Sequence, residues 1–171
     1  MELFDFLDIN GNPTGIVLEK GATLKDGQYY LGIHAYIFNS GFEFLIQRRS
    51  YNKSFAPGIW DIHLGHMIAG ESSVECMIRE VKEEIGLNIN CNDICAVKRF
   101  FWDEKDRHIV DIYFIRKEYD LDKIILQKDE VIAVKKIAGK EMTDMIRNMD
   151  YRPCEYRNIV LEEIKNIHPM S

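Results

Sequence analysis

The sequence predicts an α/β fold of the α+β type, in which a mixed β-sheet packs between helices. Three observations support it: β-rich runs fill the first part of the chain, one short helix with clear start and stop signals lies in the middle, and further strands and then helices follow. The length of 171 residues suits one globular domain, so residues 1–171 are predicted to form a single domain.

Two hairpins are expected before the central helix. The first joins residues 3–8 to residues 15–19 through Ile9-Asn10-Gly11-Asn12, and the asparagine–glycine pair favours a tight turn. A further turn is expected at residues 25–27. The second hairpin joins residues 29–38 to residues 42–48 through Asn39-Ser40-Gly41. Residues 55–60, which include Pro57 and Gly58, read as a loop.

The central helix is bracketed by sequence signals at both ends. Ser72 followed by Glu75 forms a capping-box pattern, so the helix should begin near Ser73. Gly86 is the residue type that ends a helix in the left-handed conformation. Apolar residues at three- and four-residue steps form the face that packs on the sheet: Val74, Met77, Ile78, Val81 and Ile85.

After the central helix, the sequence shows strand patterns first and helix patterns later. Strands are expected near residues 94–102, 108–116 and 131–137. Helices are expected near residues 140–148 and 155–167. No internal repeat, low-complexity segment or interdomain linker is evident.

Three glutamates of the central helix lie on a face different from the apolar one. Glu80, Glu83 and Glu84 are spaced at i, i+3 and i+4, so their carboxylates should converge on one patch. Like charges at this spacing repel, and clustered carboxylate oxygens suit a hard divalent cation such as Mg²⁺. The alternative is a solvated acidic helix face.

Residues 65–87, GHMIAGESSVECMIREVKEEIGL, resemble the Nudix box of the Nudix hydrolase superfamily. The matching positions are Gly65, Glu71, Arg79, Glu80, Val81, Lys82, Glu83, Glu84, Ile85, Gly86 and Leu87. The resemblance extends over about residues 3–147, where FDFLDINGNPTG, FLIQRRSYNKSFAPGIWDIHLGH, VDIYF and LQKDEVIAVKKI are similar to the Nudix subgroup that resembles isopentenyl-diphosphate isomerase. It implies a Nudix-type α/β/α sandwich with a mixed central sheet and an N-terminal hairpin.

The subgroup contains hydrolases and isomerases, and the residues favour a hydrolase. Leu64 occupies the position of the isomerases' catalytic cysteine, and Arg107 and Ile109 align with their two strand glutamates. Tyr30 replaces a metal-binding histidine, and only His66 matches an isomerase ligand type. Without the thiol and its glutamate partner, an isomerase has no evident means of moving protons at carbon.

The resemblance implies a magnesium-dependent hydrolase, with Mn²⁺ as a substitute, that cleaves a phosphoanhydride bond in a nucleoside diphosphate linked to some moiety X, or in a related diphosphate metabolite. Glu80 and Glu84 are the expected main metal ligands, and the Gly65 carbonyl is a further one. Glu83 is the first choice for the base or a third ligand. Arg79 completes the catalytic set by pairing with a carboxylate such as Glu71 or Glu80.

Substrate contacts are expected outside the box helix. Arg49 and Lys53 match diphosphate-contacting cations of the subgroup, and His66 directly follows the box glycine. Glu130 lies in an Asp-Glu-Val pattern that recurs in the subgroup and is a further substrate-binding candidate. Glu104 and Asp111 are other candidates for a base or ligand outside the box. The box does not identify X.

Composition narrows the choice of partners. The net charge of −6 and the absence of a basic stripe argue against a nucleic-acid duplex, and no segment has the apolar length of a membrane helix. The chain therefore reads as cytoplasmic. Its four cysteines, Cys76, Cys91, Cys95 and Cys154, lack metal-site spacing and are expected to be reduced thiols. A homodimer is left open, as is a Nudix domain that binds a metabolite without turnover.

Overall fold

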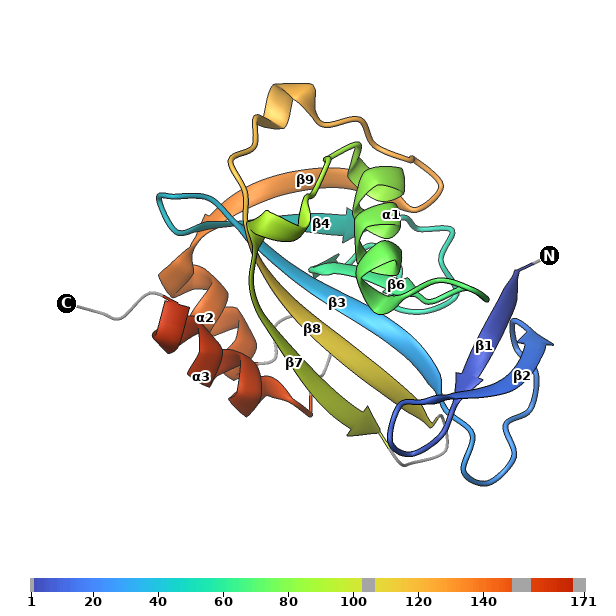
Figure 1. Cartoon of the computed structure of the whole chain (residues 1–171). Helices are drawn as coiled ribbons and strands as arrows, with labels where there is room; N and C mark the ends of the chain where they lie inside the picture. Colours follow the sequence, from blue (N-terminus) through green and yellow to red (C-terminus); the bar gives the residue numbers. More distant parts are fainter. Residues whose placement is uncertain (1, 103–106, 149–154, 168–171) are drawn as a thin grey trace.

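A computed structural model describes residues 2–102, 107–148 and 155–167 of the chain (Figure 1). A seven-stranded mixed sheet carries helix α1 (Ser73–Ile85) on one face, and helices α2 (Gly139–Asn148) and α3 (Arg157–Ile167) on the other (Figure 1). A separate two-stranded sheet is formed by β1 (Leu3–Leu7) and β2 (Pro13–Glu19). The predicted sandwich with an N-terminal hairpin is confirmed.

The large sheet is built around β3 (Tyr30–Phe38). On one edge β3 pairs in parallel with β8 (His108–Arg116), which pairs in turn with β7 (Ile94–Trp102). On the other edge it pairs with two antiparallel strands, β4 (Glu43–Arg49) and β6 (His63–His66). The outer partners of β4 are β5 (Trp60–Asp61) and β9 (Val131–Ala138).

Two hydrophobic cores lie on the two faces of this sheet, because alternate strand residues point to opposite faces. On β3, Ile33 and Ala35 belong to the core beneath α1, whereas Tyr36 belongs to the core beneath α2 and α3. The core beneath α1 also contains four helix residues: Cys76, Met77, Val81 and Ile85. The cores fix α1 above β3 and β6, which positions its carboxylates.

Both predicted ends of α1 are confirmed. The Ser72 hydroxyl accepts from the Glu75 backbone N–H, and the Glu75 side chain accepts from the Ser72 backbone N–H, which completes the capping box. Gly86 adopts φ 70° and ψ 9°, and its N–H donates to the Lys82 carbonyl. Two short 3₁₀ helices, Cys91–Asp93 and Leu121–Lys123, were not predicted.

Two local features were not predicted. Strand β6 gave no strand pattern because it is only four residues long and contains a glycine. In the turn between β3 and β4, the residue in the left-handed conformation is Phe42, with φ 56°. The Phe42 ring packs on Phe38 and over Gly139, where a Cβ would lie 2.2 Å from it, and this contact offsets the strain.

Within the described residues, no helix combines the length and apolar character that crossing a bilayer requires. Cys76, Cys91 and Cys95 are free thiols, and Cys154 lies outside the described residues.

The turn of the N-terminal hairpin packs against β7, because a Cβ on Gly11 would lie 2.4 Å from the Nη1 of Arg99. The N-terminal hairpin therefore contacts the large sheet where the Gly11 backbone meets the Arg99 side chain.

Candidate active site at the contact between α1 and β6

Strand β6 presents two positions to α1. His63 pairs with Ala35 and Gly65 pairs with Ile33, and both β3 partners belong to the core beneath α1. A Cβ on Gly65 would lie 2.1 Å from the Cγ of Glu80. The glycine therefore lets the Glu80 side chain lie directly against the β6 backbone, which explains why the box begins with this residue type.

Glu84 lies one helical turn beyond Glu80 and points into the protein. It is 5% exposed, and its Oε2 accepts from the Nε2 of Gln47 at 2.9 Å. The same oxygen lies 3.7 Å from the Nδ1 of His63. Gln47 and His63 are fully buried, so two strands contribute polar side chains to the surroundings of one box carboxylate.

Arg79 connects three of the box carboxylates. Its Nε and Nη2 donate to the two carboxylate oxygens of Glu71, at 2.8 and 2.9 Å. Its Nη1 donates to Glu80 at 2.9 Å and to Glu83 at 3.2 Å. The predicted pairing of Arg79 with Glu71 and Glu80 is confirmed, and the fork fixes the Glu71 side chain at both oxygens.

Burial raises the pKa of Glu80 to about 7. The charge of Glu84 contributes to this rise in pKa, whereas Arg79 and the His66 backbone, which hydrogen-bonds the carboxylate, oppose it. Near neutral pH the metal-free carboxyl is therefore only partly ionised. A bound cation would favour the charged form.

The three carboxylates do not converge as the helix spacing predicted. The Glu83 side chain is 53% exposed and lies on Arg79, whereas Glu84 is turned inward to Gln47. Among the described residues, no group of three His, Cys, Asp or Glu side chains is placed to hold a metal ion. The reason is that Arg79 draws Glu80 and Glu83 toward itself, which relieves their repulsion.

The donor set nevertheless fits a hard divalent cation. Glu80 lies against Gly65, in a space that a Cβ would fill, so its carboxylate and the strand backbone are close together. Beside Glu84, two buried polar atoms have no hydrogen-bond partner among the described residues, the Oε1 of Gln47 and the Nδ1 of His63, so the surroundings of this carboxylate are polar rather than apolar. Carboxylate and carbonyl oxygens are the ligands that Mg²⁺ prefers. Unsatisfied buried polar atoms are uncommon in purely structural cores.

Three of the predicted substrate-binding residues lie together near the C-terminal end of α1. Lys53 forms an ion pair with Glu130. The Ser50 N–H donates to the Glu130 carbonyl, and the Gln127 N–H donates to the Glu84 carbonyl, so this segment is tied to the last turn of α1. Arg49 lies two residues beyond Gln47 on β4 and therefore on the same face of the sheet.

Other candidates lie elsewhere. The His66 ring is on the face of β6 opposite Gly65 and stacks on Phe4, with centroids 5.9 Å apart, although the His66 carbonyl accepts from Arg79 at 3.1 Å. Asp111 is engaged by both Nε and Nη2 of Arg99 and by the Ser73 hydroxyl. These contacts give the Asp111 carboxylate a structural role. Glu104 lies outside the described residues.

Sequence reasoning missed Gln47, although one signal was present: Gln47 is the polar residue at the end of the buried run FEFLIQ. His63 was named, with His34 and His66, only as a histidine that could touch substrate or metal, because β6 itself was not recognised. Their meeting with Glu84 depends on three separate elements.

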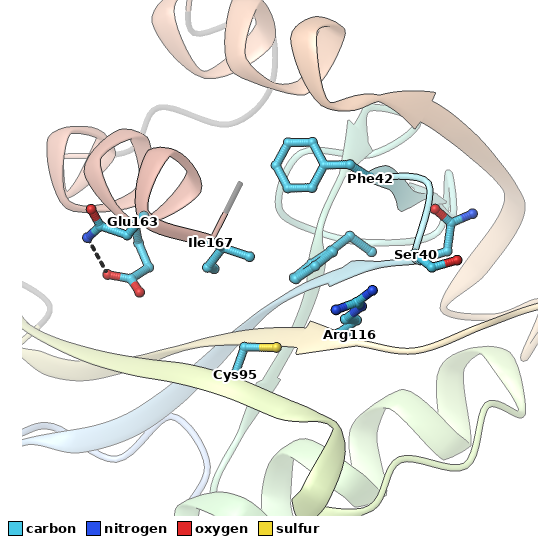
Figure 2. A pocket seen from close by; sticks show the side chains of 9 residues that line it. Ser40, Phe42, Cys95, Arg116, Glu163 and Ile167 are labelled. Carbon is cyan, nitrogen blue, oxygen red and sulfur yellow. Dashed lines mark hydrogen bonds between the residues drawn. The ribbon is translucent and has the colours of Figure 1, made fainter. Parts of the chain in front are cut away.

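A pocket of about 370 Å³ lies away from this site, at the ends of β3, β7 and β8 beneath α3 (Figure 2). Its lining includes Phe42, Cys95, Arg116 and Ile167. None of the predicted site residues lines it. The chemistry expected from the sequence therefore belongs to the α1 face of the sheet.

An α/β/α sandwich in which a loop and helix set carboxylates against a strand glycine defines a class of enzymes that cleave diphosphates. The family model described as NUDIX domain matches residues 29–150. An uncharacterised Nudix hydrolase of Listeria monocytogenes is 31% identical over 159 residues, which are 92% of this chain and 92% of that protein. The chain belongs to the Nudix hydrolase family.

Two further proteins are similar to this chain. The crystal structure of a MutT protein from Methanosarcina mazei superposes with a TM-score of 0.62 at 27% identity, covering 83% of this chain and 96% of that chain. An isopentenyl-diphosphate Delta-isomerase of Citrobacter koseri is 36% identical over 84 residues, 48% of this chain and 46% of that protein. Nudix hydrolases generally cleave nucleoside diphosphates linked to another moiety and generally use a divalent metal ion, typically Mg²⁺.

Proposed function

We propose that this protein is a magnesium-dependent hydrolase of a phosphoanhydride bond in a nucleoside diphosphate linked to X, or in a related diphosphate metabolite. The observation that carries the proposal is the position of Glu80 and Glu84. One turn apart on α1, they meet Gly65 on β6 and Gln47 on β4, respectively. Both carboxylates therefore face strands of the central sheet.

Glu80, Glu84 and the Gly65 carbonyl are the proposed metal ligands, with Glu83 as a third carboxylate ligand or the base. A bound Mg²⁺ would neutralise diphosphate charge and lower the pKa of a water molecule. Mn²⁺ is the expected substitute.

The chain's own residues account for the remaining steps. Arg79 holds Glu71 and Glu80 in fixed rotamers. Glu83, the most exposed of the three glutamates, is the proposed acceptor of the proton from the attacking water. As the new P–O bond forms, the phosphoanhydride P–O bond breaks, and the leaving phosphate group carries away the electron pair.

Arg49 and Lys53 are the proposed cations that hold the distal phosphate. Lys53 is 30% exposed and paired with Glu130, so an incoming phosphate would compete with that carboxylate for the ammonium. Glu130 would then be released toward the substrate. His66 remains a candidate through its ring, on the opposite face of β6.

An isomerase is the second candidate because of the partial match to isopentenyl-diphosphate isomerase. Its required groups are absent from the aligned positions. Leu64 packs in the core beneath α2 and α3, Ile109 is fully buried, and Arg107 pairs with Asp26. None of these side chains can donate or remove a proton at carbon near neutral pH.

The deciding experiment is a Mg²⁺-dependent cleavage screen that detects released phosphate products. Substrates should include nucleoside triphosphates, dinucleoside polyphosphates, ADP-ribose, nucleotide sugars, NADH, coenzyme A and isopentenyl diphosphate. Cleavage by the wild-type protein but not by Glu84→Gln supports the proposal. Isomerisation of isopentenyl diphosphate, or saturable binding of a compound without turnover, would replace it with one of the other two functions.

A further inference from the structure

Gln47 is buried in the central sheet, and its amide has one bond that bears on the site. It is 0% exposed and lies on β4 opposite Asp61 of β5 and Val134 of β9. Its Nε2 donates to the Oε2 of Glu84 at 2.9 Å. The Oε1 of the same amide has no hydrogen-bond partner in the part of the chain that the structure describes.

This arrangement costs free energy that apolar packing would avoid. A buried polar atom without a partner costs about 1–3 kcal/mol, and Leu45, two residues earlier on the same face of β4, shows that this strand accepts aliphatic side chains there. A glutamine at position 47 therefore needs a reason other than core packing. Its one hydrogen bond to Glu84 supplies that reason.

The hydrogen bond distinguishes the two oxygens of Glu84. Oε2 is engaged by Gln47 and faces the Nδ1 of His63 at 3.7 Å, a distance too long for a hydrogen bond. Oε1 has no hydrogen bond to a described residue. A donor on Oε2 fixes the carboxylate rotamer and leaves Oε1 to bind a cation.

We propose that Gln47, on β4, is a positioning residue that orients Glu84, on α1, for metal binding. This inference rests on the proposed function, in which Glu84 is a metal ligand. Gln47 touches neither substrate nor metal in this role. It acts by holding one carboxylate oxygen, as outer-shell partners of metal ligands do.

The test compares the wild-type protein with Gln47→Met, which keeps the size of the side chain but removes the donor. The matched control is Gln28→Met, because Gln28 is also buried, at 7% exposure, and its amide accepts from the Lys25 N–H away from the box. Mn²⁺ is titrated into each metal-free protein, and free Mn²⁺ is followed by electron paramagnetic resonance. We expect Gln47→Met to bind about 10- to 100-fold more weakly, and the control to bind as the wild type does.

A kinetic measurement separates positioning from a general structural role. Gln47→Met should raise the Mg²⁺ concentration for half-maximal activity, and excess Mg²⁺ should restore kcat with an unchanged KM for the diphosphate substrate. A structural role would instead lower kcat at every Mg²⁺ concentration. That result, or wild-type Mn²⁺ affinity in Gln47→Met, overturns the inference.

A further measurement needs no variant and so remains decisive if Gln47→Met does not fold. The side-chain amide resonances of Gln47 in the wild-type protein are followed by NMR during a Mg²⁺ titration. They should shift with the midpoint of metal binding, and insensitivity to bound Mg²⁺ overturns the inference. A wild-type protein that binds neither metal ion overturns the proposed function first, and this inference with it.

Discussion

The Glu80 side chain fills the space that the missing Cβ of Gly65 leaves free: a Cβ at position 65 would lie 2.1 Å from the Cγ of Glu80 and 2.8 Å from its Oε1. The two residues are thus a matched pair across the contact between β6 and α1. Gly65→Ala should displace the Glu80 carboxylate and raise the Mg²⁺ activation constant by about 10-fold or more. Steady-state kinetics at varied Mg²⁺ will measure it. An unchanged constant would show that Glu80 does not depend on this contact.

Glu84→Gln should abolish Mg²⁺-dependent turnover while the protein stays folded. A glutamine at position 84 can still offer its carbonyl oxygen to the Nε2 of Gln47, and one repulsive charge beside Glu80 is removed. Without metal, the melting temperature should be equal to that of the wild type or slightly higher. Loss of the folded state by circular dichroism would mean that the carboxylate has a structural role.

Gly86→Val should destabilise the protein by about 1–2 kcal/mol or more, because a β-branched residue is strained at φ 70°. A Cβ there would also lie 3.2 Å from the Cβ of Ile125. Gly86→Asn is the matched variant, since asparagine tolerates the left-handed conformation, and it should cost less. Chemical denaturation of both variants provides the comparison, and equal losses would point to crowding at Ile125 rather than backbone strain.

Arg99→Ala should cost about 3 kcal/mol, near the lower end for broken buried ion pairs because the Arg99 side chain is 37% exposed. The buried Asp111 carboxylate would lose both hydrogen bonds from Arg99 and keep the one from the Ser73 hydroxyl. Arg99→Ala with Asp111→Ala removes both charges and should recover part of the loss. A double-mutant cycle of unfolding free energies tests this, and simple additivity would contradict the coupling.

The capping box should make stability depend on pH at the acid side. Hydrogen bonds from the side chain and backbone of Ser72 hold the pKa of Glu75 below its ordinary value of 4.5. A lowered folded-state pKa contributes stability that is present above pH 4.5 and is lost as the pH falls through the folded-state value. Melting temperatures of Glu75→Gln should therefore fall less steeply than those of the wild type below about pH 5. Parallel curves would show that the charge of Glu75 does not contribute to stability.

Much of the fold could be predicted because its signals are local. Ser72, Glu75 and Gly86 each act within a few residues, and the structure has the helix where they place it. The bounds of the longer strands likewise follow from β-rich runs, whereas β5 and β6 are too short to produce one. The conformation of Phe42 could not be predicted, because it depends on packing against Gly139 from a distant part of the chain.

The site was predicted in part for the same reason. Residues on one helix could be related to each other by periodicity, and the link from Arg79 to Glu71 and Glu80 followed from the resemblance to the Nudix box and from the match between guanidinium and carboxylate groups. The periodicity could not show that Glu84 turns inward, because the donor that draws it, Gln47, lies on a different element. Contacts between elements require the sheet register, which the sequence pattern does not contain.

The parallel pairing of β3 with β8 has a consequence for synthesis of the chain on the ribosome. Tyr30 through Phe38 emerge long before His108 through Arg116, so one whole edge of β3 must wait for its partner. During that interval the apolar residues of β3 and the box helix can meet, but the sheet cannot close. A nascent chain halted before residue 108 should therefore expose an unpaired strand edge, the form most open to chaperones and to wrong pairing.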